Sequence, residues 1–236
     1  AKIGTAIMDA DIIISLNHFK GHEGAGFGGA IKNIGMGCGS RAGKMEMHSS
    51  GKPLVLSDKC KKCKKCIKIC AHNAISYDEN GIANIDHTKC VGCGRCIGIC
   101  NFDAVKSPND EAADILNKKM AEYAYAVIKD KPQFHISLIC DVSPNCDCHS
   151  ENDAPIVPNI GMLASFDMVA LDKACADLVN AQKPFENSYL GEQIKHHAHE
   201  KDNFHINHPD TNWESQIEHG EEIGLGNSEY ELIEIK

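Results

Sequence analysis

The chain has 236 residues, of which 42% are hydrophobic and 24% are charged, a composition typical of a folded globular protein. Its 33 acidic residues outnumber its 24 basic ones, and the formal net charge of -9 argues against a general nucleic-acid binder. No apolar run approaches the roughly 18 residues needed to span a bilayer. Thirteen cysteines without an export signal indicate a reducing, cytoplasmic compartment and metal binding in place of disulfides.

Helix and strand patterns alternate on both sides of a central cysteine-rich region. The expected elements are, in chain order, a helix over residues 2–8, a buried strand over 12–16, a helix over 111–129, a strand over 134–139, a helix over 169–179 and a closing strand over 229–235. These elements predict the α/β (α+β) fold class, with a two-layer α/β outer domain that the central region interrupts.

Glycines are concentrated between Gly21 and Gly43, ahead of the central region. Residues 24–29 match G-x-G-x-x-G in letters, but no βαβ unit of about 30 residues follows them. Gly43-Lys44 lacks the upstream glycine and the Ser or Thr of a Walker A loop. We therefore expect tight turns in which backbone passes close to backbone, and no nucleotide-binding loop.

The central region contains the motif C-x2-C-x2-C-x3-C twice, with an offset of 30 residues from Cys60 to Cys90. Three thiolates at this spacing bind three corners of a 4Fe–4S cube, while the fourth cysteine ligates the other cluster. A pair of zinc ribbons, the alternative, would need only two C-x2-C knuckles each. The motif predicts two 4Fe–4S clusters, one held by Cys60, Cys63, Cys66 and Cys100 and the other by Cys90, Cys93, Cys96 and Cys70.

This repeat resembles the bacterial two-cluster ferredoxins. The resemblance implies a small ferredoxin-like domain over residues 55–107, inserted between outer-domain segments 1–54 and 108–236. Ala71 and Asn101 stand where the ferredoxins usually have proline, which adds a backbone N–H that can bond a cluster sulfur.

Six lysines surround the first copy of the motif in a chain that is otherwise acidic: Lys59, Lys61, Lys62, Lys64, Lys65 and Lys68. They are either a solvated rim that offsets the negative charge of the cluster or a docking patch for an acidic redox partner.

Five cysteines lie outside the repeated motif: Cys38, Cys140, Cys146, Cys148 and Cys175. Cys140 and Cys175 fall on apolar patterns and are predicted to be buried packing residues. Cys146 and Cys148 lie two residues apart in a polar loop, where an extended backbone would present both thiols to one side.

Cys146 and Cys148 are candidates for an extra metal or redox site. The side chains that could complete it are Cys38, His18, His22 and His48, with Lys20 or Lys32 beside them. A reactive thiol and a structural role are the alternatives. A second polar segment is dense in histidine and is expected to be a solvated surface loop; it contains His196, His197, His199, His205 and His208.

Two further stretches of the sequence carry a family resemblance. The first runs from His18-Phe19-Lys20-Gly21-His22 through residues 29–37 to Arg41-Ala42-Gly43-Lys44 and His48, and the second from Cys140 to Asp172. Both are similar to the family called domain of unknown function 362, in which many members carry an inserted ferredoxin module. The resemblance implies an architecture more than an activity, and it implies that the natural domain extends upstream of Lys2.

The leading functional hypothesis is an iron–sulfur protein that passes single low-potential electrons through two 4Fe–4S clusters to a redox partner protein, as in anaerobic metabolism. One alternative is a reductase-type enzyme whose outer domain binds a substrate or metal fed by the clusters. Another is a metal-handling or redox-sensor protein built around Cys146 and Cys148. The sequence shows no acid/base pair or nucleophile triad, so the carrier is favoured and catalytic residues stay unassigned.

Overall fold

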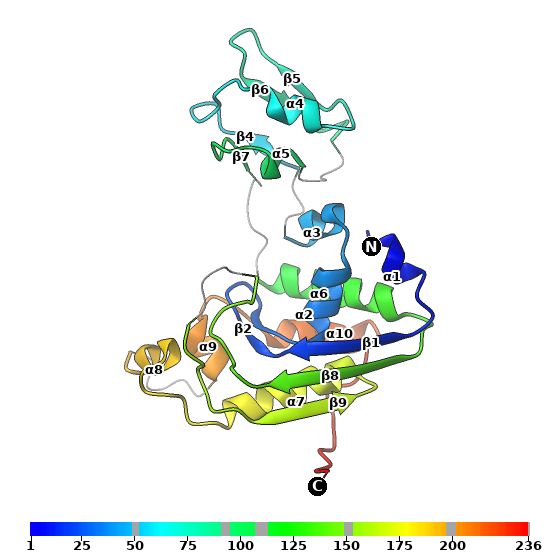
Figure 1. The fold of residues 1–236 in the computed structure, drawn as a ribbon, viewed down its shortest axis with the longest axis vertical. Helices are drawn as coiled ribbons and strands as arrows, with labels where there is room; N and C mark the ends of the chain where they lie inside the picture. The colour runs from blue at the N-terminus through cyan, green and yellow to red at the C-terminus, as the bar shows by residue number, and fades with distance from the viewer. Residues whose placement is uncertain (49–51, 91–94, 107–112, 149–152, 197–201, 236) are drawn as a thin grey trace. The chain divides into compact units, whose positions relative to one another are not determined.

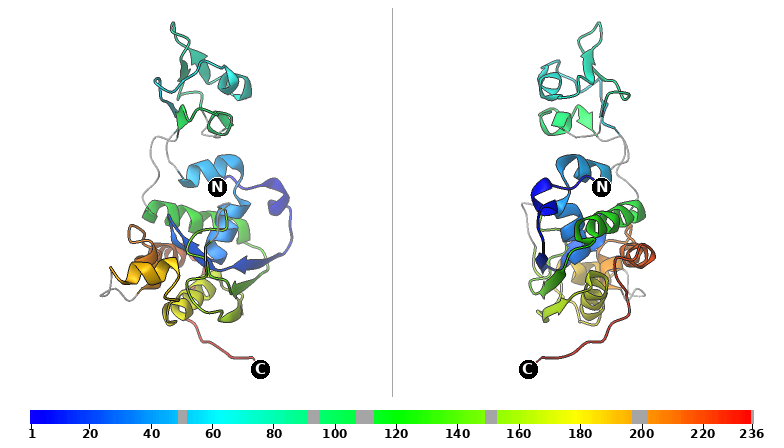
Figure 2. Two further views of the ribbon diagram at one scale, coloured as in Figure 1. Left: turned by 60° about the vertical axis from the view of Figure 1, so that its left-hand side comes forward. Right: turned by 90° about the vertical axis from the view of Figure 1, so that its right-hand side faces the viewer.

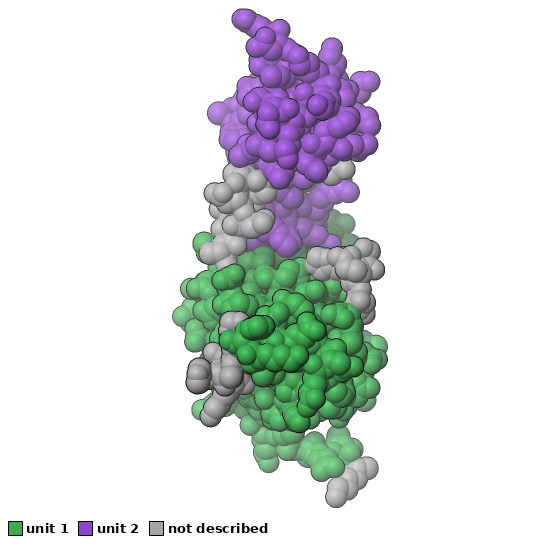
Figure 3. Space-filling model, turned by 90° about the vertical axis from the view of Figure 1, so that its left-hand side faces the viewer, with its two compact units in different colours: residues 1, 3–38, 113–236 green, residues 2, 39–112 purple. Residues whose placement is uncertain are grey.

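The computed structural model describes residues 1–48, 52–90, 95–106, 113–148, 153–196 and 202–235. The chain divides into two compact units, coloured separately in Figure 3. Unit 1 comprises Ala1, Ile3–Cys38 and Ala113–Lys236, and unit 2 comprises Lys2 and Gly39–Ala112. Both are built from helices and short sheets, which confirms the α+β fold class. Unit 2 begins at Gly39 and so includes α3 (Arg41–His48), whereas the sequence pattern places these residues in the outer domain.

Unit 1 contains a sheet, a small hairpin and most of the helices (Figures 1 and 2). Its strands are β1 (Ile13–His18), β2 (Lys20–His22), β3 (Gly26–Gly28), β8 (Gln133–Ile139) and β9 (Gly161–Ser165). Its helices are α1 (Thr5–Met8), α2 (Ala30–Cys38), α6 (Ala113–Ile128), α7 (Met168–Asn180), α8 (Tyr189–Ile194), α9 (Asn203–Asn207) and α10 (Glu214–Glu222). None of the described helices is long and apolar enough to cross a membrane.

The sheet of unit 1 has the strand order β1-β8-β9, with β1 parallel to β8 and β9 antiparallel to it. Helices α2 and α7 pack against one face of this sheet (Figure 1). Strands β2 and β3 form a separate antiparallel hairpin in which Gly26 pairs with His22 and Gly28 with Lys20. The glycines of the G-x-G-x-x-G string therefore form a β-hairpin, as expected for close backbone packing, and not a nucleotide-binding turn.

In the β1-β8-β9 sheet, several polar side chains lie on the buried face and several large apolar side chains lie on the exposed face, which is the reverse of the usual arrangement. Side chains alternate along a strand, and on β1 the side chains under the helices include the buried Ser15 and Asn17, whereas Ile14 and Leu16 are 70% and 69% exposed. Buried polar groups need hydrogen bonds, and here Asn17 Nδ2 donates to Ser15 Oγ at 2.8 Å. Ser15 Oγ in turn lies 2.7 Å from Nδ1 of the fully buried His135. The prediction that residues 12–16 form a buried strand was therefore wrong for Ile14 and Leu16, which lie on the exposed face.

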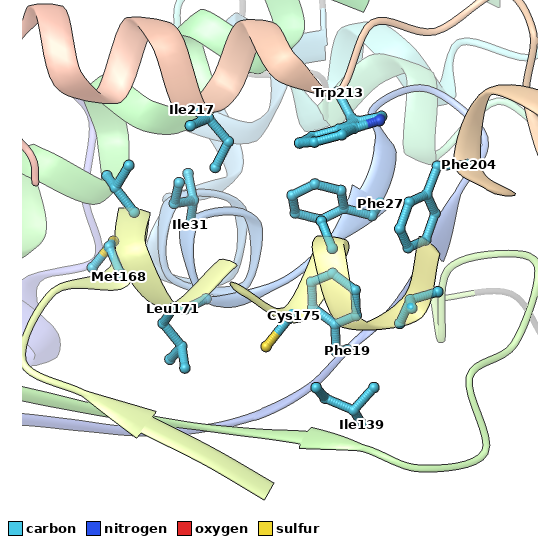
Figure 4. Close-up of a cluster of buried hydrophobic side chains, with 14 of the residues drawn as sticks. Phe19, Phe27, Ile31, Ile139, Met168, Leu171, Cys175, Phe204, Trp213 and Ile217 are labelled. Carbon is cyan, nitrogen blue, oxygen red and sulfur yellow. The ribbon is translucent and has the colours of Figure 1, made fainter. Parts of the chain in front are cut away.

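Aromatic and aliphatic side chains form the core between the helices and the hairpin (Figure 4). The ring centroids of Phe27 lie 4.9 Å from Phe19, 5.5 Å from Phe204 and 5.3 Å from Trp213. Burying each such side chain contributes roughly 1.5–3 kcal/mol. Because Phe19 directly precedes β2 and Phe27 lies within β3, this core fixes the hairpin against α9 and the start of α10.

The elements predicted inside the chain were confirmed in position, whereas those predicted at its two ends were shortened or absent. The helices expected over 111–129 and 169–179 are α6 and α7, and the strand over 134–139 is β8. The helix over 2–8 is shortened to α1. Residues 229–235 form no strand, because no neighbouring strand pairs with them and a strand without partners is not stable.

Unit 2 is a small module of short strands and helices. Besides α3, its elements are β4 (Leu54–Val55), α4 (Lys65–Ile69), β5 (Ile75–Tyr77), β6 (Ala83–Ile85), α5 (Arg95–Gly98) and β7 (Val105–Lys106). Strand β4 pairs with β7 and β5 pairs with β6, both antiparallel. The first pairing brings the two ends of the module together. Cysteines share the core between these strands and helices with aliphatic side chains such as Ile75, Ile85 and Val105.

Candidate functional sites

The first copy of the motif places Cys60 and Cys63 on the loop before α4, Cys66 within α4 and Cys70 directly after it. Lys62 and Lys64 adopt positive φ angles of 55° and 62°, a left-handed conformation that costs a non-glycine residue roughly 1–2 kcal/mol. In the second copy of the motif the sequence has Gly92 and Gly94 at the corresponding positions, which lie outside the described residues. Strained backbone of this kind is often retained at functional sites, and it winds the loop so that its thiols converge.

One pocket of unit 2 is lined by cysteines from both copies of the motif. Cys60, Cys63 and Cys66 come from the first copy and Cys100 from the second. Apolar and aromatic side chains complete the lining, among them Tyr77, Ala83, Phe102, Ala104 and Val105. The structure therefore brings together the four thiols predicted for one cluster, in the crossed combination that the spacing implies.

The remaining motif cysteines pack in the same core. Cys70, Cys90 and Cys96 all contact its apolar cluster, and Cys93 lies outside the described residues. Cys70 Sγ accepts a hydrogen bond from the Ala74 backbone N–H at 3.4 Å. Thiols that gather among apolar side chains, with a backbone N–H bond to one of them, Cys70, are a donor set that fits a 4Fe–4S cluster.

Unit 1 holds a second group of thiols, on the loop that follows β8. This loop is fixed at Pro144, whose carbonyl oxygen accepts hydrogen bonds from Asn207 Nδ2 and His208 Nε2, both at 2.7 Å. The Gly21 N–H donates to the Ser143 carbonyl at 2.9 Å. A Cβ on Gly21 would lie 2.0 Å from the Pro144 carbonyl oxygen, so only glycine permits this approach. The contacts hold Cys146 against strand β2.

Helix α2 supplies the cation nearest to Cys146. The carboxylate of Asp172 on α7 accepts the backbone N–H groups of Ala30 and Ile31 at 2.6 and 2.8 Å, and so caps the first turn of α2. Burial of Asp172 raises its pKa to about 7. Lys32 lies in the same first turn of α2, and its Nζ is 2.9 Å from Cys146 Sγ.

The Cys146 thiol is buried, with 3% of its surface exposed. Burial raises its pKa, but hydrogen bonds from His22, Cys148 and Lys32 outweigh this effect and lower the pKa to about 5. Burial and the hydrogen bond to Cys146 raise the pKa of Cys148 to about 11. Near neutral pH, Cys146 is therefore a thiolate and Cys148 a thiol.

A charged network borders this thiolate. Asp147 contacts Lys20 Nζ at 3.2 Å and His18 Nδ1 at 2.9 Å. His18 Nε2 bonds the Cys140 carbonyl oxygen at 2.8 Å, so both ring nitrogens of His18 are already engaged. Burial lowers the pKa of Lys20, although Asp147 opposes that effect.

The structure assembles only part of the extra metal site considered from the sequence. His22, Cys146 and Cys148 come together, and Lys20 and Lys32 join them. Cys38 lies six residues beyond Lys32 on α2, about 9 Å further along the helix axis. His48 ends α3 in unit 2, and both nitrogens of His18 are occupied. The chain turns at Asp147 and Cys148, where an extended backbone was expected.

The histidine-dense segment is exposed at His196, as predicted, and less exposed at its later described histidines. His205 and His208 are partly buried, whereas His197 and His199 lie outside the described residues. Asp202, His205 and Glu214 place ligand atoms within 4.8 Å of one another. Asp202, however, caps α9 through the N–H groups of Phe204 and His205 and accepts a bond from Trp213 Nε1 at 2.9 Å. These bonds give Asp202 a structural role.

The fold and these sites define a mixed α/β protein with an inserted cysteine-rich module. The chain matches the model of the family described as Domain of unknown function (DUF362) over residues 1–177, and it belongs to that family. The match covers unit 2, the β2–β3 hairpin and the Cys146 loop, and it ends within α7. A comparison with curated proteins gave no match.

Proposed function

We propose that this DUF362 protein is an electron carrier that holds two 4Fe–4S clusters in unit 2 and exchanges single electrons with a redox partner protein. The observation that carries the proposal is the pocket in which Cys60, Cys63 and Cys66 meet Cys100 from the second motif. Zinc ribbons do not need this crossed set, because each closes its site within two adjacent knuckles.

The chain's own residues have three roles in this proposal. The eight motif cysteines, Cys93 included, hold the irons as thiolates. The apolar lining, which includes Val105 at 3% exposure, limits water around the clusters. Backbone donors such as the Ala74 N–H stabilise negative charge on the sulfurs and so raise the reduction potential. When bound, each cluster accepts and releases one electron.

The exposed lysine patch supports the proposal that the redox partner is an acidic protein. All six lysines of the patch, Lys59 to Lys68, are exposed, in a chain whose net charge is -9. A local positive surface on an acidic protein orients a negatively charged partner toward the adjacent pocket, with a rate that decreases as ionic strength rises. We propose this patch as the docking surface for electron exchange.

The test is the metal content of anaerobically purified protein. We expect about eight iron and eight sulfide per chain, with the spectrum of reduced 4Fe–4S clusters in electron paramagnetic resonance. Cys100→Ser should perturb the same cluster signal as Cys60→Ser, and Cys70→Ser the other signal. Cys140→Ser, outside the motif, is the matched control and should keep both clusters. Zinc in place of iron would refute the proposal, as would a Cys70→Ser spectrum that matches that of Cys60→Ser.

A reductase-type enzyme is the second candidate, and the observation that favours it is the Cys146 thiolate in unit 1. Simple carriers have no need of a buried thiolate surrounded by lysine and histidine side chains.

A further inference from the structure

Electron transfer through unit 2 gives no role to the group of buried polar side chains in unit 1. Cys146, Lys20 and His22 are 3%, 3% and 6% exposed, and Lys32 is 9% exposed. Such groups are costly to bury unless they compensate one another. Two hydrogen-bond donors converge on Cys146 Sγ. Lys32 Nζ lies 2.9 Å from it, and the Cys148 backbone N–H lies 3.4 Å from it.

The hydrogen bonds of His22 decide between a metal site and a thiolate site. His22 Nδ1 accepts the backbone N–H groups of Gly24 and Ala25 at 3.0 and 3.2 Å. The proton of the ring is therefore on Nε2, which leaves a donor for the hydrogen bond between His22 and Cys146. A histidine that donates to the sulfur has no lone pair directed at a shared ion, and Lys32 has none either. The group is built to stabilise an anionic sulfur.

Cys148 is the second thiol of the group. It is exposed, lies on the turn after Asp147, and its thiol hydrogen-bonds to Cys146. A buried thiolate next to an exposed protonated thiol is the arrangement of a nucleophilic cysteine and its resolving cysteine. Because little of Cys146 reaches the surface, large oxidants are excluded and small ones are favoured.

We propose that Cys146 and Cys148 form a dithiol site for small hydroperoxides. The Cys146 thiolate attacks the terminal oxygen of the hydroperoxide, the O–O bond breaks, and the leaving alkoxide or hydroxide takes a proton from Lys32, which solvent restores. Cys146 is then a sulfenic acid, and Cys148 attacks its sulfur to form a Cys146–Cys148 disulfide and release water. In total, two thiols lose two electrons and two protons, and the hydroperoxide becomes an alcohol, or water, plus one water.

The proposal does not depend on the clusters, because the readout is the peptide that contains both cysteines. Anaerobic full-length protein is treated with equimolar hydrogen peroxide, alkylated, digested and analysed by mass spectrometry. We expect this peptide to lose two hydrogens before Cys140 or Cys175 is oxidised. In Cys148→Ser, a sulfenic acid should accumulate on Cys146 and be trapped by dimedone. Oxidation of Cys146 no faster than Cys140, or a disulfide to another cysteine, would overturn the proposal.

The cation beside the sulfur provides the second arm of the test. Lys32→Met should slow peroxide oxidation of Cys146 about tenfold at neutral pH, because less of the thiol is ionised. Lys32→Arg retains the charge and should restore most of the rate, and the exposed Lys183→Met is the control. A Lys32→Met rate equal to that of the wild type would contradict the assigned role. Stoichiometric zinc bound by Cys146 and Cys148 would do so as well.

The pH profile of the unmodified protein is a readout that does not require a variant to fold. The titratable groups that face Cys146 are Lys20, His22, Glu23, Lys32, Asp147 and Cys148. We expect the oxidation rate to rise with a midpoint well below that of an ordinary thiol. A midpoint in the ordinary thiol range would refute the thiolate assignment.

Discussion

Replacing Gly21 with alanine tests whether the backbone contact at Pro144 sets the chemistry of Cys146. The new Cβ would lie 2.0 Å from the Pro144 carbonyl oxygen, and such contacts essentially never fall below 3.0 Å. Asn207 and His208 both donate to that oxygen. Relief of the clash therefore requires a shift of about 1 Å between β2 and the Cys146 loop, with distortion of these two bonds.

The effect on the thiolate follows from its distance to Lys32. If the shift reaches Cys146 in full, the separation of Sγ from Nζ grows from 2.9 Å to about 3.9 Å. At an effective dielectric constant of about 20, the attraction weakens from about 5.7 to about 4.3 kcal/mol. This loss of about 1.4 kcal/mol raises the pKa of Cys146 by about one unit. The strain should also lower the free energy of unfolding by about 1–3 kcal/mol.

The assay is the rate of iodoacetamide alkylation of Cys146 as a function of pH, read by mass spectrometry. We expect the midpoint for Gly21→Ala to lie about one unit above that of the wild type. Gly37→Ala is the control, because a Cβ at Gly37 would meet no atom of another described element within 4 Å. A folded Gly21→Ala protein with an unchanged midpoint would show that the loop contact does not determine the thiolate.

Two further predictions concern the stability of unit 1. Burial lowers the pKa of His135 from 6.5 to about 4, so its contribution to stability is complete above pH 6.5 and decreases as the pH falls toward 4. The advantage of the wild type over His135→Gln in urea unfolding should therefore shrink by about 3 kcal/mol over that range, and a constant difference would contradict the reasoning. Gly35→Ala places a Cβ 2.2 Å from the Met120 carbonyl oxygen of α6 and should cost about 1–3 kcal/mol. Gly37→Ala should gain up to about 1 kcal/mol from helix propensity, and equal effects at both positions would refute the packing argument.

The sequence was most informative where periodicity or spacing is governed by local geometry. Helices α6 and α7 have long apolar stripes, and their positions were predicted to within a few residues. The motif cysteines were found in the same way, because thiolate spacing on a short loop is a local property. Strand β1 was assigned correctly but its burial was not, since no local signal indicates that Ser15 and His135 hydrogen-bond beneath the helices.

The Cys146 site shows the limit of such reasoning. Its two thiols were recognisable as polar-loop cysteines, but their distances to Lys32 and His22 depend on the hairpin, α2 and the Pro144 contacts together. Asp172, which positions α2, ends a stretch that carries the family resemblance, but nothing in the sequence indicated that it caps α2. At residues 229–235 the sequence predicted too much. The alternating pattern there is typical of a strand, but a strand forms only where a partner strand lies beside it, and the local pattern does not indicate whether one does.

The insertion of unit 2 between α2 and α6 has a consequence for folding kinetics. These two helices pack closely at Gly35 and Met120, yet residues 39–112, 74 in number, separate them. Once β4 pairs with β7, the covalent path that remains to be closed between α2 and α6 shortens to the 21 residues of 39–53 and 107–112. The entropy of loop closure then falls by about 1 kcal/mol. Under the proposed function, cluster binding stabilises unit 2 and should therefore accelerate the folding of unit 1 about sixfold.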